Sequence, residues 1–335
     1  MPRYRVNCST MMFLVILQGA GVVLFFSWYT QLSPCDHNPP TSGSSFLGQV
    51  FSQHPSVFYL MEALRMAVRD LLRSVFQCDF SVMESYLPEY PNVSSLFMWS
   101  HSRALCSPPI CSLTPRVEQA CDSYSHVVYK DVRLFELESL YPLLQDSNLD
   151  LRIIHLVRDP RAVVDNAIVL EQKRIKEAEV QYQVMQEICR SHVRINERAV
   201  LKPPPFLKGR YKLVRYEDMA RNPLEEINAM YQFVGLEMTT ELATWIYKVT
   251  HGKGKGSIKE AFKITSRSAT NVSQAWRTML PYNKVRRIQE VCKGAMSLLG
   301  YRTVNSEKEQ KRLDIDLLAE VGTPIIPKLK PLTLG

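Results

Sequence analysis

The sequence predicts an α/β fold in which helices cover a central parallel sheet, preceded by one transmembrane helix. Short apolar runs typical of buried strands alternate with amphipathic helical segments from Ser45 onward. An uncharged, apolar run at residues 11–29 comes before them. The chain has 335 residues, 46% of them hydrophobic, and can bury one substantial core, so we expect one large domain.

The N-terminal apolar run has the length and the flanking charges of a membrane anchor. At about 1.5 Å per residue it would span roughly 28 Å, close to the thickness of the hydrocarbon core. Arg3 and Arg5 precede it and the next basic residue is Arg65, so the positive-inside rule predicts a cytosolic tail at 1–10 and a lumenal remainder. A cleaved signal peptide is the alternative, but its apolar region would be shorter and would end at a small-x-small site rather than in Phe-Phe-Ser-Trp-Tyr.

The rest of the chain divides into a stem, a lumenal domain and a tail. Residues 30–41 are polar and contain three prolines, which predicts a stem without regular structure. A domain follows at 42–318, and the Pro- and Lys-containing residues 319–335 form a loose tail. Apolar runs predict strands, and helical periodicity predicts helices, at the following positions: strands at 57–61, 126–130, 151–157 and 211–214, and helices at 44–51, 63–76, 171–200 and 223–234.

Cysteines and sequons fit an oxidising, lumenal environment. Of eight cysteines, Cys8 would be cytosolic and the others lumenal, without a CxxC pair, so we expect disulfides and no metal site. The lumenal number is odd, which leaves open a free thiol, an interchain bond or a lost partner. Asn92-Val93-Ser94 and Asn271-Val272-Ser273 are candidate glycosylation sites.

The charge pattern favours an anionic ligand but not nucleic acid. The formal net charge is +8, yet the basic residues are spread along the chain, and most of this charge is expected on a solvated surface. No helix-turn-helix, zinc-finger or aromatic RNA-binding signature is present, so no nucleic acid partner is expected. Hydrolase and metalloenzyme classes are excluded too, since there is no G-x-S-x-G, HExxH or Cys/His ligand set.

Two segments have the chemistry to bind phosphate or sulfate. Ser42-Gly43-Ser44-Ser45 opens a predicted helix, where free N–H groups and the helix dipole can hold an anion, although an ordinary turn and N-cap is the alternative. Arg158 and Arg161 follow the buried strand 151–157 at the edge where open α/β sheets bind ligands. An arginine there can grip a phosphate bidentately, or it can pair with Asp159 and brace the turn.

Long blocks of the sequence resemble the Golgi N-acetylglucosamine, galactose and keratan 6-O-sulfotransferases. The similarity runs from Ser42 to about Leu318. It is carried by these blocks: 42–49, 57–62, 67–70, 102–109, 155–163, 189–194, 201–206, 213–218 and 271–277. The resemblance implies a P-loop-like, three-layer sulfotransferase fold in a single-pass type II protein of the Golgi membrane, and it leaves open a homo-oligomer.

The resemblance also implies a reaction and its site residues. The sulfate donor would be 3′-phosphoadenosine 5′-phosphosulfate, with its 5′-phosphosulfate on Ser42, Gly43, Ser44 and Ser45 and its 3′-phosphate on Arg158. The acceptor would be the 6-hydroxyl of N-acetylglucosamine or galactose in a glycan. Glu62, the acidic residue after the second strand of the domain, is the candidate general base, and an exposed structural glutamate is the alternative.

Several positions depart from the pattern of this family. The residues before Ser42 replace an apolar strand, and Thr41 stands where the family has an arginine. A substrate-facing loop after Glu62 is absent, and Asp165 lies near the place of a phosphate-binding serine. These losses predict impaired transfer. Because they are clustered between well-matched blocks, they suggest exon skipping, a faulty gene assembly or a decaying paralogue, three causes that the sequence leaves open. The alternative function is a non-catalytic Golgi membrane protein that binds glycan, sulfate donor or a sister enzyme.

Overall fold

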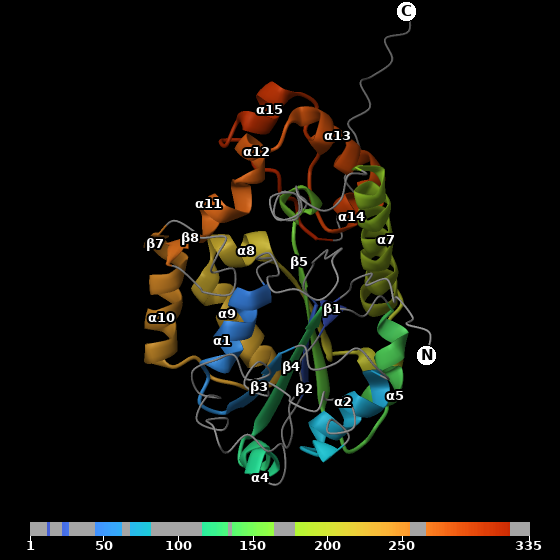
Figure 1. Cartoon of the computed structure of the whole chain (residues 1–335), viewed down its shortest axis with the longest axis vertical. Coiled ribbons are helices and arrows are strands. Elements are labelled where there is room, and N and C mark those ends of the chain that lie inside the picture. Colours follow the sequence, from blue (N-terminus) through green and yellow to red (C-terminus); the bar gives the residue numbers. More distant parts are fainter. Residues whose placement is uncertain are drawn as a thin grey trace, which may run out of the picture.

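The computed structural model describes residues 12–13, 22–26, 44–61, 68–81, 116–132, 136–163, 178–254 and 266–321. Within this part of the chain, a six-stranded sheet is covered by helices on both sides (Figure 1). A separate two-stranded sheet pairs β7 (His251–Lys253) with β8 (Arg267–Ser268). The expected α/β class is confirmed.

Five parallel strands form the main sheet. They lie in the order β3 (Val57–Met61), β4 (His126–Val132), β2 (Val22–Phe26), β5 (Leu151–Val157) and β6 (Tyr211–Arg215), and β1 (Met12–Phe13) adds antiparallel to β4. The chain leaves β2 toward β3 on one side and leaves β5 toward β6 on the other. The strand order therefore reverses between β2 and β5, and open α/β sheets bind ligands at the carboxyl ends of strands at such a point.

The strand register brings the carboxyl ends to one edge of the sheet. Met61 of β3 and Phe25 of β2 both pair with Lys130 of β4, and Val157 of β5 pairs with Arg215 of β6. Helix α1 (Ser44–Ser52) joins β3 through a tight turn in which the Val57 N–H donates to the His54 carbonyl at 3.1 Å. Because α1 runs back along the sheet, its N-terminus lies at this same edge.

The N-terminal segment differs from the sequence prediction. The sequence predicts a membrane-spanning helix at 11–29 and no strand before Ser42, whereas Met12–Phe13 and Val22–Phe26 are strands. No helix within the described ranges is long and apolar enough to cross a membrane. The physical reason is that a short run of Val, Leu and Phe suits a central parallel strand as well as a membrane helix, and periodicity cannot separate the two. The other residues of 11–29, and residues 36–41, lie outside the described part.

Helices form the outer two layers. On one side of the sheet lie α1, α8 (Tyr216–Arg221), α9 (Pro223–Val234) and α10 (Thr240–Thr250), and on the other lie α2 (Val68–Phe76), α5 (Tyr141–Leu144) and α7 (Ala178–Asn196) (Figure 1). The chain after β8 adds α11 (Ala269–Gln274), α12 (Trp276–Met279), α13 (Tyr282–Val291), α14 (Lys293–Leu298) and α15 (Glu307–Lys311). Helix α4 (Arg116–Asp122) precedes β4.

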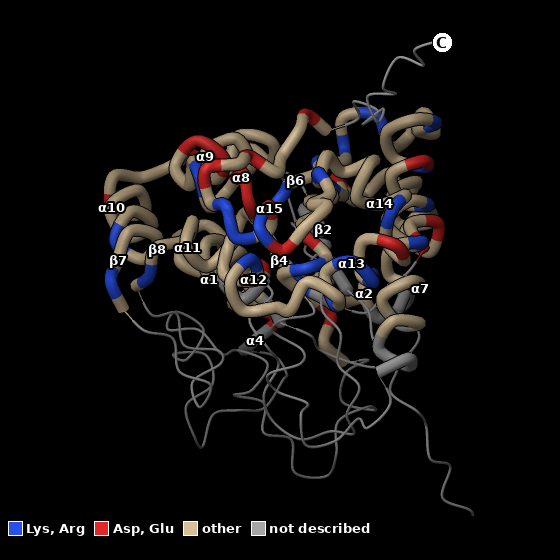
Figure 2. The backbone as a smooth tube through the Cα atoms, turned by 90° about the horizontal axis from the view of Figure 1, so that it is seen from above, with Lys and Arg blue, Asp and Glu red and all other residues tan. Residues whose placement is uncertain are grey.

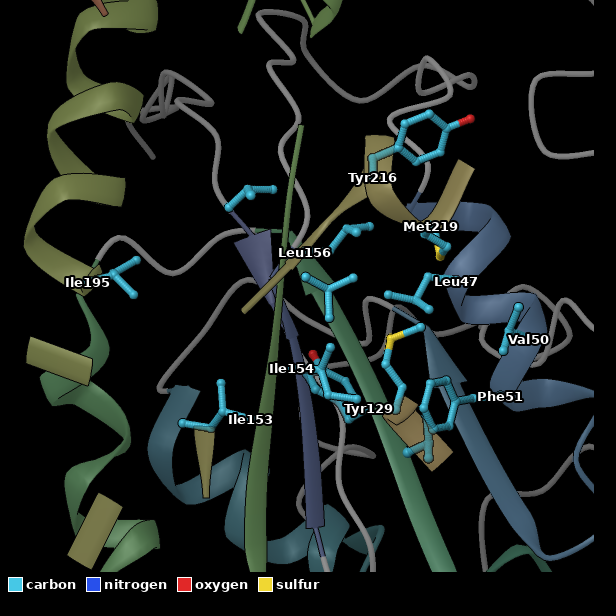
Figure 3. Close-up of a cluster of buried hydrophobic side chains, with 14 of the residues drawn as sticks. Leu47, Val50, Phe51, Tyr129, Ile153, Ile154, Leu156, Ile195, Tyr216 and Met219 are labelled. Atoms are coloured by element: carbon cyan, nitrogen blue, oxygen red, sulfur yellow. The ribbon is translucent and has the colours of Figure 1, made fainter. Parts of the chain in front are cut away.

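One part of the core lies between α1 and the sheet. Leu47 and Phe51 of α1 point toward the strands and are fully buried (Figure 3). The ring of Phe51 meets Tyr231 of α9 edge to face at 5.4 Å, and the Tyr231 hydroxyl donates to the Val50 carbonyl at 2.6 Å. At Gly48, a Cβ atom would lie 2.2 Å from the Tyr59 hydroxyl of β3. The lack of a side chain at Gly48 therefore sets how closely α1 approaches the sheet.

Most sequence-predicted boundaries agree with the structure. β3 and β5 match the predicted ranges, and α9 ends at Val234 with Gly235 in the left-handed region at φ 81°. Helix α7 continues into a π-helical turn at Glu197–Leu201, just before the three prolines. Disulfides join Cys78 to Cys121 and Cys189 to Cys292, while Cys35, Cys106 and Cys111 lie outside the described residues.

Candidate active site

Arg158 lies in the turn directly after β5, at the carboxyl edge of the sheet. Its residue is only 3% exposed. Its guanidinium carbon lies 4.5 Å from the ring centroid of Tyr216, the first residue of α8, and its Nη2 donates to the Val272 carbonyl in α11 at 3.2 Å. Two elements that follow β5 by more than fifty residues therefore set the direction of this side chain. A desolvated, oriented guanidinium is suited to binding an anion.

Arg161 braces the same turn. Its Nε and Nη2 donate to the two carboxylate oxygens of Asp159 at 2.9 and 2.7 Å, and its guanidinium carbon lies 4.2 Å from the ring centroid of Trp276. Its Nη1 donates to Gln289 Oε1 and to the Arg302 carbonyl, each at 2.9 Å. The side chain is fully buried. The bracing alternative considered for the two arginines is thus correct for Arg161.

Glu217 lies beneath the turn, and sequence reasoning assigned it no role. Its carboxylate accepts the Asp159 N–H at 3.0 Å and the Tyr301 hydroxyl at 2.9 Å. Burial raises the pKa of Glu217 to about 7, helped by the nearby charge of Asp159 and opposed by Arg158 and the two hydrogen bonds. The available signal was an acidic residue two positions after strand β6, at the ligand-binding edge.

The predicted phosphosulfate loop is described in part. Ser44 and Ser45 are the first two residues of α1, so their backbone N–H groups lie at the carboxyl edge of the sheet. Ser42, Gly43 and the side chains of Ser44 and Ser45 lie outside the described part. Glu62 also lies outside it, one position after β3, so its assignment as a general base stays a prediction.

Charge is mixed around the edge where these elements meet. Figure 2 shows Lys and Arg positions interspersed with Asp and Glu, with acidic positions on α8 and α9. Lys130, near the carboxyl end of β4, is another buried cation at this edge and is 3% exposed. Within the described ranges no group of three or more His, Cys, Asp or Glu could hold a metal ion. The described groups at this edge that have the chemistry to bind an anion are cationic side chains and backbone N–H groups.

Comparison with known proteins identifies the family. Residues 38–300 match the family model described as the sulfotransferase domain. Human carbohydrate sulfotransferase 6 is 53% identical over 329 aligned residues, which cover 84% of this chain and 83% of that protein. Mouse carbohydrate sulfotransferase 5 is 48% identical, with 96% of this chain and 95% of that protein covered. This chain belongs to the carbohydrate sulfotransferases. Mouse carbohydrate sulfotransferase 4 is 46% identical, with 83% and 84% covered.

The sulfate donor of this family can be compared with the chemistry of the carboxyl edge. Sulfotransferases take their sulfate from 3′-phosphoadenosine 5′-phosphosulfate, which carries anionic groups at both ends of its ribose. The N-terminus of α1 and the buried Arg158 lie at one edge of the sheet, on elements that follow the neighbouring strands β2 and β5. A helix N-terminus and a guanidinium, one on each side of the reversal in strand order, have the chemistry to bind a ligand of this kind.

Proposed function

We propose that this chain transfers a sulfuryl group from 3′-phosphoadenosine 5′-phosphosulfate to the 6-hydroxyl of N-acetylglucosamine or galactose in a glycan. The observation that carries the proposal is the buried Arg158, stacked on Tyr216 at the carboxyl edge that also holds the N-terminus of α1. The carbohydrate acceptor is supported by the names of the relatives that match most of the chain.

The proposed mechanism relies on positioning and charge. A transferring sulfuryl group, like a phosphoryl group, spreads negative charge over its oxygens and needs oriented N–H groups and cations. In this proposal the N–H groups of Ser44 and Ser45 hold the phosphosulfate, and Arg158 holds the 3′-phosphate. Glu62, the next residue in the sequence after β3, accepts the proton of the attacking hydroxyl. The sulfate donor supplies the activated sulfuryl group.

A binding and transfer assay tests this function. Calorimetry with adenosine 3′,5′-bisphosphate, the product of transfer, measures donor-site affinity, and labelled sulfate is followed onto N-acetylglucosamine- and galactose-terminated oligosaccharides. Binding together with 6-O-sulfation of either sugar supports the proposal. Sulfate found at another hydroxyl, or on neither sugar at any enzyme concentration, contradicts the assignment of the acceptor.

We further propose that transfer by this chain is slow. Thr41 cannot supply the positive charge that an arginine gives to the leaving group, and losing one such contact costs on the order of 10² to 10³ in rate. A chimera in which residues 36–41 are replaced by an apolar strand ending in arginine, and in which the loop after Glu62 is restored, should recover turnover. A wild-type chain as fast as the chimera would contradict slow transfer. Full nucleotide binding without turnover in either protein would favour the non-catalytic alternative.

We propose that this chain is a single-pass type II protein of the Golgi membrane, anchored by residues 11–29, with its catalytic domain in the lumen. Two disulfides, Cys78–Cys121 and Cys189–Cys292, support an oxidising compartment, because cytosolic proteins rarely keep such bonds. Asn271, one of the two lumenal sequons, is exposed at the start of α11 and is open to a glycan. The strand at Val22–Phe26 competes with this anchor for the same residues.

A further inference from the structure

Glu217 is an acidic side chain in a site that must attract an anion. Glu217 is the second residue of α8, and 7% of its surface is exposed. A buried carboxylate beside Arg158 lowers the positive potential that a phosphate would meet. This unfavourable effect on anion binding must be offset by another contribution of Glu217, and its hydrogen bonds supply one.

The carboxylate of Glu217 fixes the turn that carries Arg158. One oxygen accepts the N–H of Asp159, the residue next to Arg158, and the other accepts the hydroxyl of Tyr301. The preceding residue, Tyr216, places its ring against the Arg158 guanidinium. The first turn of α8 thus holds both the backbone and the side chain of this arginine.

We propose that Glu217 is a positioning residue for the binding of the sulfate donor. It holds the turn that carries Arg158 and tunes the affinity of the Arg158 guanidinium for the 3′-phosphate. The inference rests on the proposed function, in which Arg158 binds that phosphate. Glu217 is not expected to touch the reacting atoms, and its effect is transmitted through Asp159 and Arg158.

The groups around Glu217 determine how its charge acts. Arg158 and Asp159 face it from the end of β5, Tyr301 faces it from the chain after α14, and Arg221 lies on its own helix. Asp159 forms an ion pair with Arg161, and its charge opposes the ionised form of Glu217. Protonation of Glu217 therefore leaves the charge of Arg158 less opposed, while the neutral carboxyl group keeps an oxygen that can accept the Asp159 N–H. Because the pKa of Glu217 is raised to about 7, this change falls between pH 6 and 8.

The Glu217→Gln variant separates the two effects, since glutamine keeps one acceptor oxygen for the Asp159 N–H and removes the charge. We expect it to bind adenosine 3′,5′-bisphosphate about three- to tenfold more tightly than wild type at pH 8, and within about twofold of wild type at pH 6. Glu217→Ala, which also loses the acceptor, should bind about tenfold more weakly than Glu217→Gln at both pH values. Comparing variants at one pH cancels the titration of the ligand itself.

Controls and kinetics complete the experiment. Glu225→Gln, an equal charge change at an exposed position on α9, should behave as wild type at both pH values. In the transfer assay, Glu217→Gln should alter KM for the sulfate donor and leave kcat within about twofold of wild type. Equal affinity of wild type and Glu217→Gln at pH 8 overturns the inference. Nucleotide binding that does not depend on Arg158, or no binding by wild type, overturns the proposed function as well.

Discussion

Arg158 and Arg161 leave the same turn at the end of β5 and meet different partners. The Arg161 guanidinium is surrounded by Asp159, Gln289 and the Trp276 ring. It also donates to the backbone carbonyl of Arg302. Arg158 lies against Tyr216 and reaches α11. The same chemical group therefore has different partners at the two positions, because the surrounding elements differ.

Loss of Arg158 should weaken nucleotide binding. Removing one charge-assisted hydrogen bond costs about 1.5 to 3 kcal/mol, so Arg158→Ala should raise the Kd for adenosine 3′,5′-bisphosphate about 10- to 150-fold. Arg158→Lys should recover part of the affinity, because it keeps the charge but not the planar fork. Arg286→Ala, an equal charge loss on the exposed face of α13, serves as the control and should leave the Kd unchanged. An unchanged Kd in Arg158→Ala would disprove the strand-end assignment.

The buried pair His155 and His192 should make the fold acid-sensitive. Their rings stack at 5.0 Å, with His155 Nε2 and His192 Nδ1 3.0 Å apart. Burial lowers the pKa of His192 to about 3 and holds that of His155 well below its usual value, also through His192. Only the unfolded chain then takes up these protons, so stability is present above about pH 6.5 and is lost as the pH falls.

Glu217 acts on stability in the opposite direction over part of this range. Its raised pKa means that the folded state holds its proton more tightly, so its contribution is largest below about pH 4.5 and is lost as the pH rises toward 7. Urea titration from pH 7 to 5.5 should therefore show a steeper loss of unfolding free energy in Glu217→Gln than in wild type. We expect a fall of about 1 to 3 kcal/mol in the variant. A shallower slope in the variant than in wild type would exclude this assignment.

At the scale of single elements, the close packing of α1 on β3 depends on one glycine. A side chain at Gly48 would collide with the Tyr59 hydroxyl, whose own residue is 2% exposed and has little room to move. Overpacking of a core costs about 1 to 3 kcal/mol, while Gly to Ala in a helix returns up to about 1 kcal/mol. The packing effect is the larger of the two.

Gly48→Ala should therefore destabilise the domain by about 1 to 2 kcal/mol in urea unfolding, despite the better helix former. It should also displace the N-terminus of α1 and weaken nucleotide binding. Gly294→Ala on α14 is the matched control, because its nearest neighbour to a new Cβ lies at 3.9 Å, an ordinary contact. A Gly48→Ala protein as stable as the control variant would mean that the helix can shift without cost.

Features that depend on neighbouring residues can be predicted from the sequence, and features that depend on contacts distant in the chain cannot. β3 and β5 are predictable because each is a short apolar run bounded by turn residues, and α9 because proline and glycine mark its ends. The contacts of Glu217 are not predictable, since its partners lie 58 and 84 positions away along the chain. Strand β2 escapes prediction for a different reason, because its composition fits two environments equally well.

At the scale of the whole molecule, the segment Val22–Phe26 bears on both the expected membrane topology and the central sheet. Val22–Phe26 is a central strand in the structure, and the same residues complete the apolar run expected to anchor the chain. One copy of this segment cannot occupy a bilayer and the sheet together. Its location in a cell therefore also determines whether the sheet keeps a strand between β4 and β5.

An anchored protein should stay in the membrane fraction after alkaline carbonate extraction and should shift in mass by one or two glycans on glycosidase treatment. Replacing Val23 and Phe25 with aspartate should release it, because charges are expensive in the hydrocarbon core. Replacing Asp36 and His37 in the stem serves as the control. A wild-type protein that is fully extracted and unglycosylated would support the strand placement and disprove the anchor.

The Cys189–Cys292 bond joins α7 to the end of α13 and closes a segment of 103 positions along the chain. Tyr216 and Glu217 lie inside the closed segment, whereas Arg158 and Tyr301 lie outside it. A protease that cuts once between the two cysteines therefore yields two fragments that stay joined by the disulfide. Arg158, Tyr216, Glu217 and Tyr301 all remain in this covalently linked molecule. Such a nicked protein should run as one band without reductant and as two with it, and before reduction it should still bind nucleotide.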